Sequence, residues 1–111
     1  MTEPNRGQVP PRVPAQDGTG AQRYPEPTVG ALIVDPAGRL LLVRSHKWRG
    51  LYTVPGGHVE LVEHLTEALL REAQEETGLA VYAPELLCIQ EFVYDDGFWK
   101  PRHFIFFDYA C

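Results

Sequence analysis

The stretch from Gly57 to Leu79, GHVELVEHLTEALLREAQEETGL, constrains the fold of this chain more than any other part. From about His64 to Thr77 it contains no Pro or Gly, and its Leu, Ala, Glu, Gln and Arg residues favour an α-helix. Gly78 follows at the point where many helices end in a left-handed residue. The sequence therefore predicts a helix over residues 64–77, preceded by a glycine-containing loop.

This predicted helix has one apolar face and one acidic face. The apolar face recurs every three or four residues and consists of Leu65, Ala68, Leu69 and Ala73. The acidic face carries three carboxylates at i, i+3 and i+4, from Glu72, Glu75 and Glu76. Clustered carboxylate oxygens are the ligands that Mg²⁺ or Mn²⁺ prefers. The pattern predicts a divalent metal site, and the alternative is a charged, solvated helix without metal.

Arg71 lies among these acids and completes a longer motif. Its guanidinium can hold a carboxylate in a fixed orientation. The motif reads Gly57, five residues, Glu63, seven residues, then REAQEETGL from Arg71 to Leu79. It resembles the signature box of the Nudix hydrolases with no fixed position missed, and chance would produce it on the order of once in a billion starting points. A wider resemblance runs from about Thr28 to Ala110.

The resemblance implies a fold, a reaction and a set of site residues. The fold would be α/β, with the signature helix on a mixed, twisted β-sheet in an α-β-α sandwich. The reaction would be hydrolysis of a nucleoside diphosphate linked to another group X, with Mg²⁺ or Mn²⁺ as cofactor. Metal ligands would be the Gly57 carbonyl oxygen and the carboxylates of Glu72, Glu75 and Glu76. Glu72 or Glu76 would act as the base, and Arg71 and Glu63 would orient them. The alternative is a Nudix-fold module that binds a nucleotide or a protein with little or no hydrolysis.

Two residues in the loop depart from the family pattern. Val62 stands where the family usually has Gly, and His64 stands where Ser or Thr commonly caps the helix. Histidine caps a helix poorly because it is a weak acceptor for backbone N–H groups. A helix that starts later, at Thr66 or Glu67, is therefore the alternative to a start near residue 64.

The segment before this motif is predicted as a tail followed by short strands. Residues 1–27 are rich in Pro, Gly and Gln and are predicted to be a disordered tail, which leaves residues 28–111 as one domain. Residues 29–34 and 40–43 are predicted to pair as a β-hairpin across the turn at residues 35–38. Residues 51–54 form a third short strand before the glycines.

A short basic loop at residues 45–50 joins the second and third predicted strands. It is either a solvated connection or a substrate-binding element, in which Arg44, Lys47 or Arg49 meets phosphate and Trp48 lines the base or ribose. The sequence alone favours the solvated connection.

The segment after the helix is predicted to be mostly extended. Residues 79–94 are interrupted near Pro84, residues 95–97 form a turn, and residues 103–110 form an apolar central strand covered on both sides. Glu91 is predicted to be a solvated edge residue. Relatives in the family continue with another strand and a closing helix, so we expect an exposed sheet side that a second copy covers as a homodimer.

Composition narrows the partners further. The chain of 111 residues has a formal net charge of −5, which argues against duplex nucleic acid as a partner. Its two cysteines favour a reducing compartment over a disulfide framework. No apolar run approaches the ~18 residues of a membrane span, and no signal-peptide core is present, so the sequence predicts a cytoplasmic protein without membrane contact.

Overall fold

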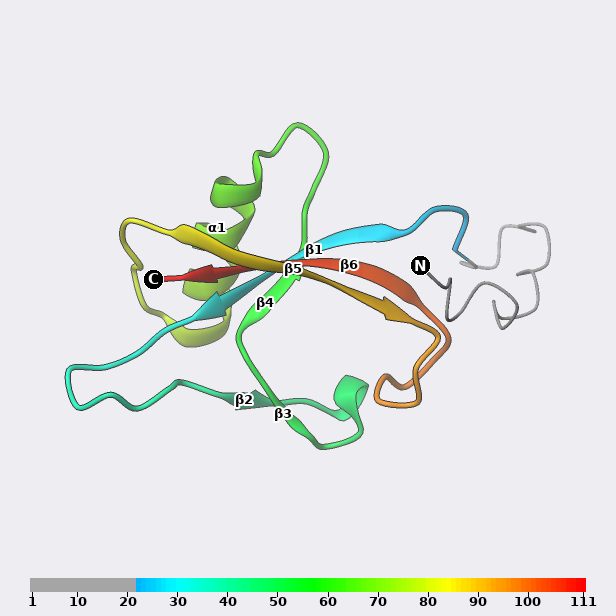
Figure 1. The fold of residues 1–111 in the computed structure, drawn as a ribbon, viewed down its shortest axis with the longest axis horizontal. Helices are drawn as coiled ribbons and strands as arrows, with labels where there is room; N and C mark the ends of the chain where they lie inside the picture. Colours follow the sequence, from blue (N-terminus) through cyan, green and yellow to red (C-terminus); the bar gives the residue numbers. More distant parts are fainter. Residues whose placement is uncertain (1–21) are drawn as a thin grey trace, which may run out of the picture.

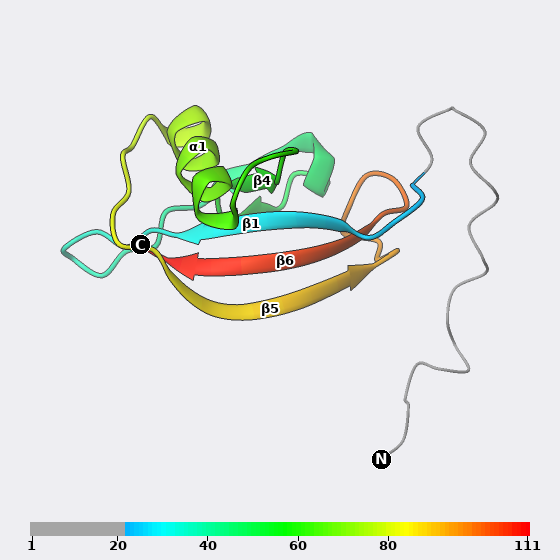
Figure 2. The ribbon, with the colours of Figure 1, turned by 90° about the horizontal axis from the view of Figure 1, so that it is seen from above.

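The computed structural model of this chain describes residues 22–111 and shows a mixed four-stranded sheet with one helix (Figure 1). The strands are β1 (Glu26–Leu32), β4 (Gly56–His58), β5 (Glu85–Val93) and β6 (His103–Ala110), in the order β4-β1-β6-β5. β1 and β6 are parallel, whereas β4 and β5 run antiparallel to their neighbours. Figure 2 shows β1, β6 and β5 side by side, with β5 at the outer edge. The predicted α/β architecture is confirmed.

The helix α1 (Leu65–Thr77) begins and ends close to the predicted residues. His64 is the N-cap residue, and its backbone N–H donates to the Glu67 carboxylate at 2.7 Å. Gly78 ends the helix with a φ of 75° and donates its N–H to the Gln74 carbonyl oxygen at 2.9 Å. The alternative of a later start is wrong, because the helix begins at Leu65 and its first turn is tied down by the Glu67 carboxylate, which accepts the His64 backbone N–H.

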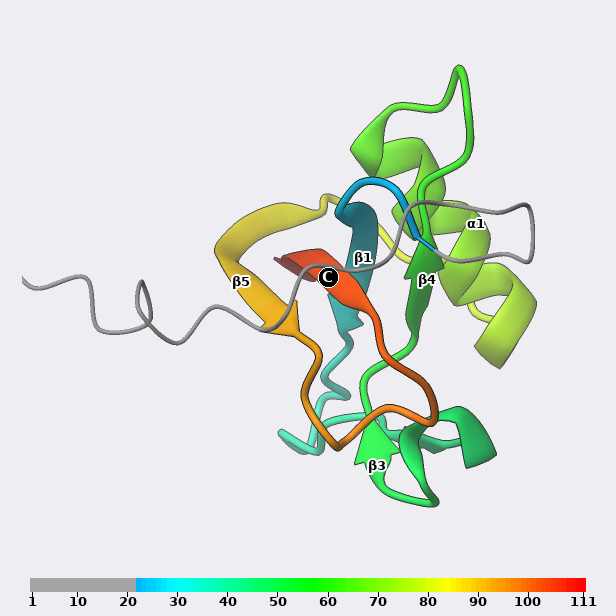
Figure 3. The same cartoon turned by 90° about the vertical axis from the view of Figure 1, so that its right-hand side faces the viewer.

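Two different structures cover the two faces of the sheet. α1 lies on one face, above β1 and β4, and its Leu69 packs against Val29, Ala31 and Tyr109 in the core. On the other side, β2 (Val43–Arg44) pairs with β3 (Tyr52–Thr53) in a separate arm that also carries the 3-10 helix His46–Trp48. Figure 3 shows α1 beside β4 on the right and this arm at the bottom. Within residues 22–111 there is one α-helix and therefore one helix layer.

The predicted hairpin forms next to its turn, where the Leu41 N–H donates to the Ile33 carbonyl oxygen at 2.9 Å, but it does not extend along the two predicted strands. Asp35 accepts N–H bonds from Ala37 and Arg39, and an isolated bridge joins Val34 to Leu40. The chain then leaves the sheet, because β4 and β6 already occupy both edges of β1. The second strand is accordingly displaced to β2, where it pairs with the third predicted strand.

The remaining predictions about the sheet divide in the same way. β6 is central, as predicted, whereas residues 79–84 form no strand and β5 is one continuous strand from Glu85. Glu91 is exposed on β5, as predicted. Most of the predicted tail lies outside the described residues, although its last two residues, Glu26 and Pro27, belong to β1. Among residues 22–111, no helix is long and apolar enough to cross a membrane.

Candidate active site

Arg71 is the centre of the acidic site. It forms a two-pronged ion pair with Glu63, with Nε 2.7 Å from Oε2 and Nη2 3.0 Å from Oε1. Its Nη1 donates to Glu72 at 2.9 Å and to Glu75 at 3.3 Å. Its Nη2 also donates to the His58 carbonyl oxygen at 2.9 Å, which ties α1 to β4. Arg71 thus fixes the loop acid and two helix acids in one network, as its predicted orienting role requires.

The network changes the proton affinity of its members in opposite directions. Hydrogen bonds from the Arg71 guanidinium and from the Glu60 N–H lower the pKa of Glu63 to about 2. The same carboxylate raises the pKa of Arg71 above its ordinary value. Burial raises the pKa of Glu72, although the hydrogen bond from Arg71 opposes that effect. Glu63 is therefore a fixed anion, whereas Glu72 is the acid that holds a proton more readily.

The two glycines of β4 allow the helix acids to approach the sheet. The Glu72 carboxylate occupies the space beside Gly57, where a Cβ would lie 2.4 Å from the Glu72 Cδ. Gly56 donates its N–H to Glu76 Oε1 at 2.8 Å, and a Cβ there would lie 2.0 Å from the Val29 carbonyl oxygen. Any side chain at either position would displace the acids or the sheet.

The donor set suits a hard divalent cation. Glu72 and Glu76 border the same cavity as Gly57, and the Glu75 side chain is 59% exposed and can turn. No three His, Cys, Asp or Glu side chains within residues 22–111 form a closed ligand set. The pairing explains this, because Arg71 holds Glu72 and Glu75 while the Gly56 N–H holds Glu76.

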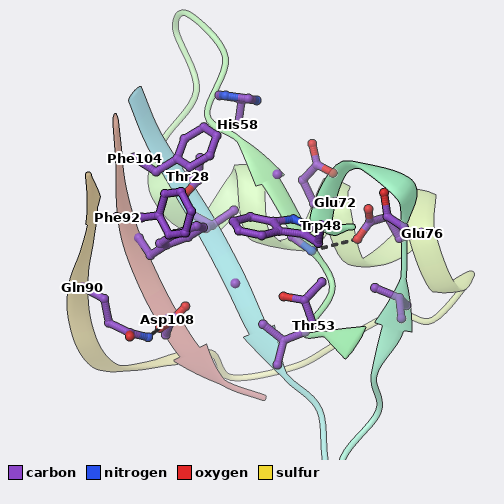
Figure 4. Close-up of a pocket in the computed structure, with 18 of the residues that line it drawn as sticks. Thr28, Trp48, Thr53, His58, Glu72, Glu76, Gln90, Phe92, Phe104 and Asp108 are labelled. Carbon is purple, nitrogen blue, oxygen red and sulfur yellow. Dashed lines mark hydrogen bonds between the residues drawn. The ribbon is translucent and has the colours of Figure 1, made fainter. Parts of the chain in front are cut away.

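A cavity of about 870 Å³ lies between the arm and the face of the sheet opposite α1. Figure 4 shows Glu72 and Glu76 on one side of it, Gln90 and Asp108 on another, and the Trp48 indole between them. Its aromatic wall consists of Trp48, Phe92, Phe98, Phe104 and Phe106. The acidic site therefore opens into a cavity that has one aromatic wall and is large enough for a nucleotide.

The structure brings only part of the predicted substrate-binding set to this cavity. Lys47 and Trp48 line it. Arg44 instead lies over the Tyr52 ring, 5.3 Å from its centroid, and Arg49 donates to the Asp96 carbonyl oxygen at 2.5 Å. Neither of these two arginines is among the lining residues.

Sequence reasoning missed the polar residues at the floor of the cavity. These are Thr28, Gln90 and Asp108, of which Thr28 and Asp108 are buried; Thr53 lines the cavity from the arm. A signal was present in the sequence, since Asp108 is an acid inside the apolar run FIFFDYA. Because side chains alternate along a strand, it shares one face with Phe104 and Phe106. An acid at such a position requires either a hydrogen-bond partner or a ligand.

The NUDIX domain family model matches residues 24–111, which is most of the chain. The chain belongs to the Nudix family. Its curated relatives include the m7GpppN-mRNA hydrolase NUDT17 of Xenopus laevis, 47% identical over 55 residues, and an ADP-ribose pyrophosphatase of Methanocaldococcus jannaschii, 37% identical over 57 residues. These alignments cover 46% and 50% of this chain but only 19% and 34% of the relatives. The chain therefore matches a fifth to a third of those proteins.

Solved structures confirm the Nudix fold. A MutT Nudix hydrolase from Burkholderia pseudomallei matches with a TM-score of 0.69 and 30% identity, covering 80% of this chain and 67% of that one. A MutT protein from Methanosarcina mazei matches with a TM-score of 0.66 and 29% identity, covering 81% and 65%. The resemblance read from the signature box is thus a family membership, and the fold is MutT-like.

Proposed function

We propose that this Nudix domain hydrolyses the diphosphate bridge of a nucleoside diphosphate linked to another group, with a divalent metal as cofactor. The supporting observation is the arrangement of Glu72 and Glu76 at the mouth of an aromatic cavity, with Arg71 and Glu63 fixed behind them. Relatives named for m7GpppN-mRNA, ADP-ribose and NAD-capped RNA support a nucleotide-derived substrate.

The residues divide the work by position. Glu72, Glu75, Glu76 and the Gly57 carbonyl oxygen are the proposed ligands of Mg²⁺ or Mn²⁺. Such an ion, when bound, would neutralise anhydride oxygens and lower the pKa of water. Arg71 holds Glu72 at 2.9 Å, so this acid is oriented before substrate arrives. Lys47 and Trp48 line the cavity and are the proposed contacts to phosphate and to the base or ribose.

A proton acceptor is needed for the attacking water, and either Glu72 or Glu76 is the proposed base. The Glu76 carboxylate accepts one hydrogen bond from a backbone N–H. The Glu72 carboxylate is largely buried and accepts a hydrogen bond from the Arg71 guanidinium. A hydrogen bond to a backbone amide leaves a carboxylate oxygen available for a proton. No serine or cysteine nucleophile takes part in this proposal, so water attacks directly and no covalent intermediate forms.

The decisive experiment is hydrolysis of a substrate panel by wild-type protein and the Glu76→Gln variant in Mg²⁺ or Mn²⁺. The panel includes ADP-ribose, dinucleotides and nucleoside triphosphates. We expect nucleoside monophosphate as one product from wild-type protein, and a rate lower by about 100-fold or more for Glu76→Gln. Glu91→Gln is the matched control, because Glu91 is exposed on β5 and lies outside the cavity.

Unchanged turnover in Glu76→Gln would refute the proposed site. Tight nucleotide binding without cleavage in either metal would instead establish the alternative, a Nudix-fold binding module. A melting temperature within a few degrees of wild type is needed for both variants, so that lost activity is not lost folding.

A further inference from the structure

Asp108 is an acid at the centre of the sheet face that forms the cavity floor. In the register of the sheet it lies beside Gly30 of β1 and opposite Cys88 of β5. It is only 6% exposed, although Figure 4 shows its side chain directed from β6 into the cavity with Gln90 beside it. A buried carboxylate on this floor needs compensating hydrogen bonds.

The two oxygens of this carboxylate have different surroundings. Oδ2 accepts a hydrogen bond from Gln90 Nε2 and a weaker one from Cys88 Sγ at 3.7 Å. Within residues 22–111, Oδ1 has no hydrogen-bond partner, and no lysine, arginine or histidine pairs with Asp108. One buried acceptor is therefore left open on the cavity floor.

Gly30 keeps that oxygen uncovered. A Cβ at residue 30 would lie 2.5 Å from Asp108 Oδ1 and 3.2 Å from Val54 Cγ2. The φ of Gly30 is not in the left-handed region, so the backbone conformation does not demand glycine at this position. The space above the carboxylate is what an added side chain would fill.

The lining of the rest of the cavity indicates what kind of ligand would bring a donor to this acceptor. Aromatic rings of Trp48, Phe104 and Phe106 form its walls, and the space continues to Glu72 and Glu76. A planar ring attached to a diphosphate fits both features, since aromatic walls favour a planar base and the acids lie where the diphosphate would react.

We propose that the cavity takes a nucleobase with an exocyclic amino group, which donates a hydrogen bond to Asp108 Oδ1. This inference rests on the proposed function, because that function is what puts a nucleotide in the cavity. Adenine, guanine and cytosine carry such a group. Hypoxanthine and uracil carry a carbonyl oxygen where adenine and cytosine carry the amine, so an acceptor rather than a donor would face Asp108 Oδ1.

Asp108 is therefore a specificity-determining residue, and Gln90 is its positioning residue. Gln90 occupies Oδ2, so the free oxygen is held toward the cavity rather than rotating away. A hydrogen bond to a buried acceptor, lost in a base that presents a carbonyl oxygen instead, corresponds to about a 10- to 100-fold difference in affinity.

The test is calorimetric binding of two matched pairs of nucleoside monophosphates, CMP with UMP and AMP with IMP. The buffer contains EDTA, so no hydrolysis contributes to the heat. We expect the amino member of at least one pair to bind about 10- to 100-fold more tightly to wild-type protein. Asp108→Asn should reduce that ratio to less than about threefold, because an amide can turn either a donor or an acceptor toward the base.

Asp95→Asn is the matched control, since Asp95 lies in a loop outside the cavity and should leave the ratio unchanged. Equal affinity within both pairs, no affinity for any of the four, or a preference that survives in Asp108→Asn would each overturn the inference. The wild-type comparison is decisive even if Asp108→Asn does not fold.

The outcome can also be separated from that of the proposed function. Cleavage of the anhydride panel without base preference would leave the hydrolase in place and remove only this inference. Base preference without cleavage under any metal condition would leave the inference and remove the hydrolase.

Discussion

The two faces of the sheet are built from the same strands, but one packs against α1 in the core and the other borders the cavity. On β1, Val29 and Ala31 point to α1 and are buried, whereas Thr28 and Gly30 point to the cavity. The helix face is filled by Leu69, which is 0% exposed. The arm face is roofed by two-residue strands and aromatic rings, which leave a space of about 870 Å³.

The difference shows where stability and binding are separable. A continuous helix packs its side chains into the sheet without gaps, so its apolar residues contribute chiefly to folding. A short arm can cover a sheet without filling it, so its rings contribute walls to a site. Arg71 and the helix acids lie at the β4 edge, where the two faces meet. Variants of each region should therefore give distinct signatures.

The largest expected effect comes from the helix face. Leu69→Ala removes a fully buried side chain and should lower the free energy of unfolding by about 2–5 kcal/mol. Nucleotide affinity of the folded fraction should change little, because Leu69 does not line the cavity. Urea denaturation and calorimetric binding at low temperature measure the two quantities. Leu70→Ala, at a side chain 41% exposed, is the control and should cost far less. Similar costs for the two variants would contradict the comparison.

Substitutions at the border between the two faces should change the rate of hydrolysis. Arg71→Lys keeps the charge but loses the fork that binds Glu63 through two nitrogens, so Glu72 loses its fixed orientation. We expect kcat to fall by about 100-fold with a smaller change in KM. Steady-state hydrolysis measures this, and Arg39→Lys at the exposed pair with Asp35 is the control. Wild-type kcat in Arg71→Lys would show that the network is merely structural.

Substitutions on the cavity face should change the affinity for nucleotide. Gly30→Ala places a methyl group 2.5 Å from Asp108 Oδ1, so the carboxylate must turn and the floor must shift. Affinity for the preferred nucleotide should fall by about tenfold, the equivalent of one lost hydrogen bond. Gly97→Ala is the control, because its nearest atom would be 3.7 Å away. Calorimetry that found equal affinity for Gly30→Ala and wild type would show that the floor is not contacted.

Val62 offers a smaller, favourable change outside both faces. Its φ is 65°, in the left-handed region that disfavours a β-branched residue, and its side chain is fully exposed. Val62→Gly should raise the free energy of unfolding by about 1 kcal/mol, since relief of strain exceeds the entropy that glycine gains on unfolding. Leu61→Gly, at the exposed neighbour without this conformation, should lower it instead. Urea midpoints of the two variants that moved in the same direction would contradict this explanation.

The pH dependence of stability should carry one contribution from Glu63. Its pKa is about 2 in the folded chain against an ordinary value of 4.5. The stabilisation is therefore present above pH 4.5 and is lost as the pH falls from 4.5 toward 2. Glu63→Gln should show a shallower loss of stability over that interval, measured by urea midpoints at several pH values. Parallel curves for the variant and wild type would refute the assignment.

Local signals in the sequence predicted the helix and the acidic site, because both depend on neighbours within one helical turn or one short loop. The signature from Gly57 to Leu79 located α1 to within a residue and named Arg71 and Glu63 as the residues that orient the helix acids, and the structure pairs these two with each other. The predicted hairpin stays short, because the pairing of β1 is decided by β4 and β6, which come later in the chain. Asp108 was missed for the same reason, since its surroundings come from β1 and β5.

β1 contributes residues to both faces of the sheet, so a change in its length would affect the core and the cavity together. Side chains alternate along a strand, so inserting one residue before Thr28 would move Thr28 into the place of Val29 and Val29 into the place of Gly30. The helix would then meet a hydroxyl group, and the cavity would receive a valine over its carboxylate. The residue count of this strand should therefore stay constant over evolutionary time.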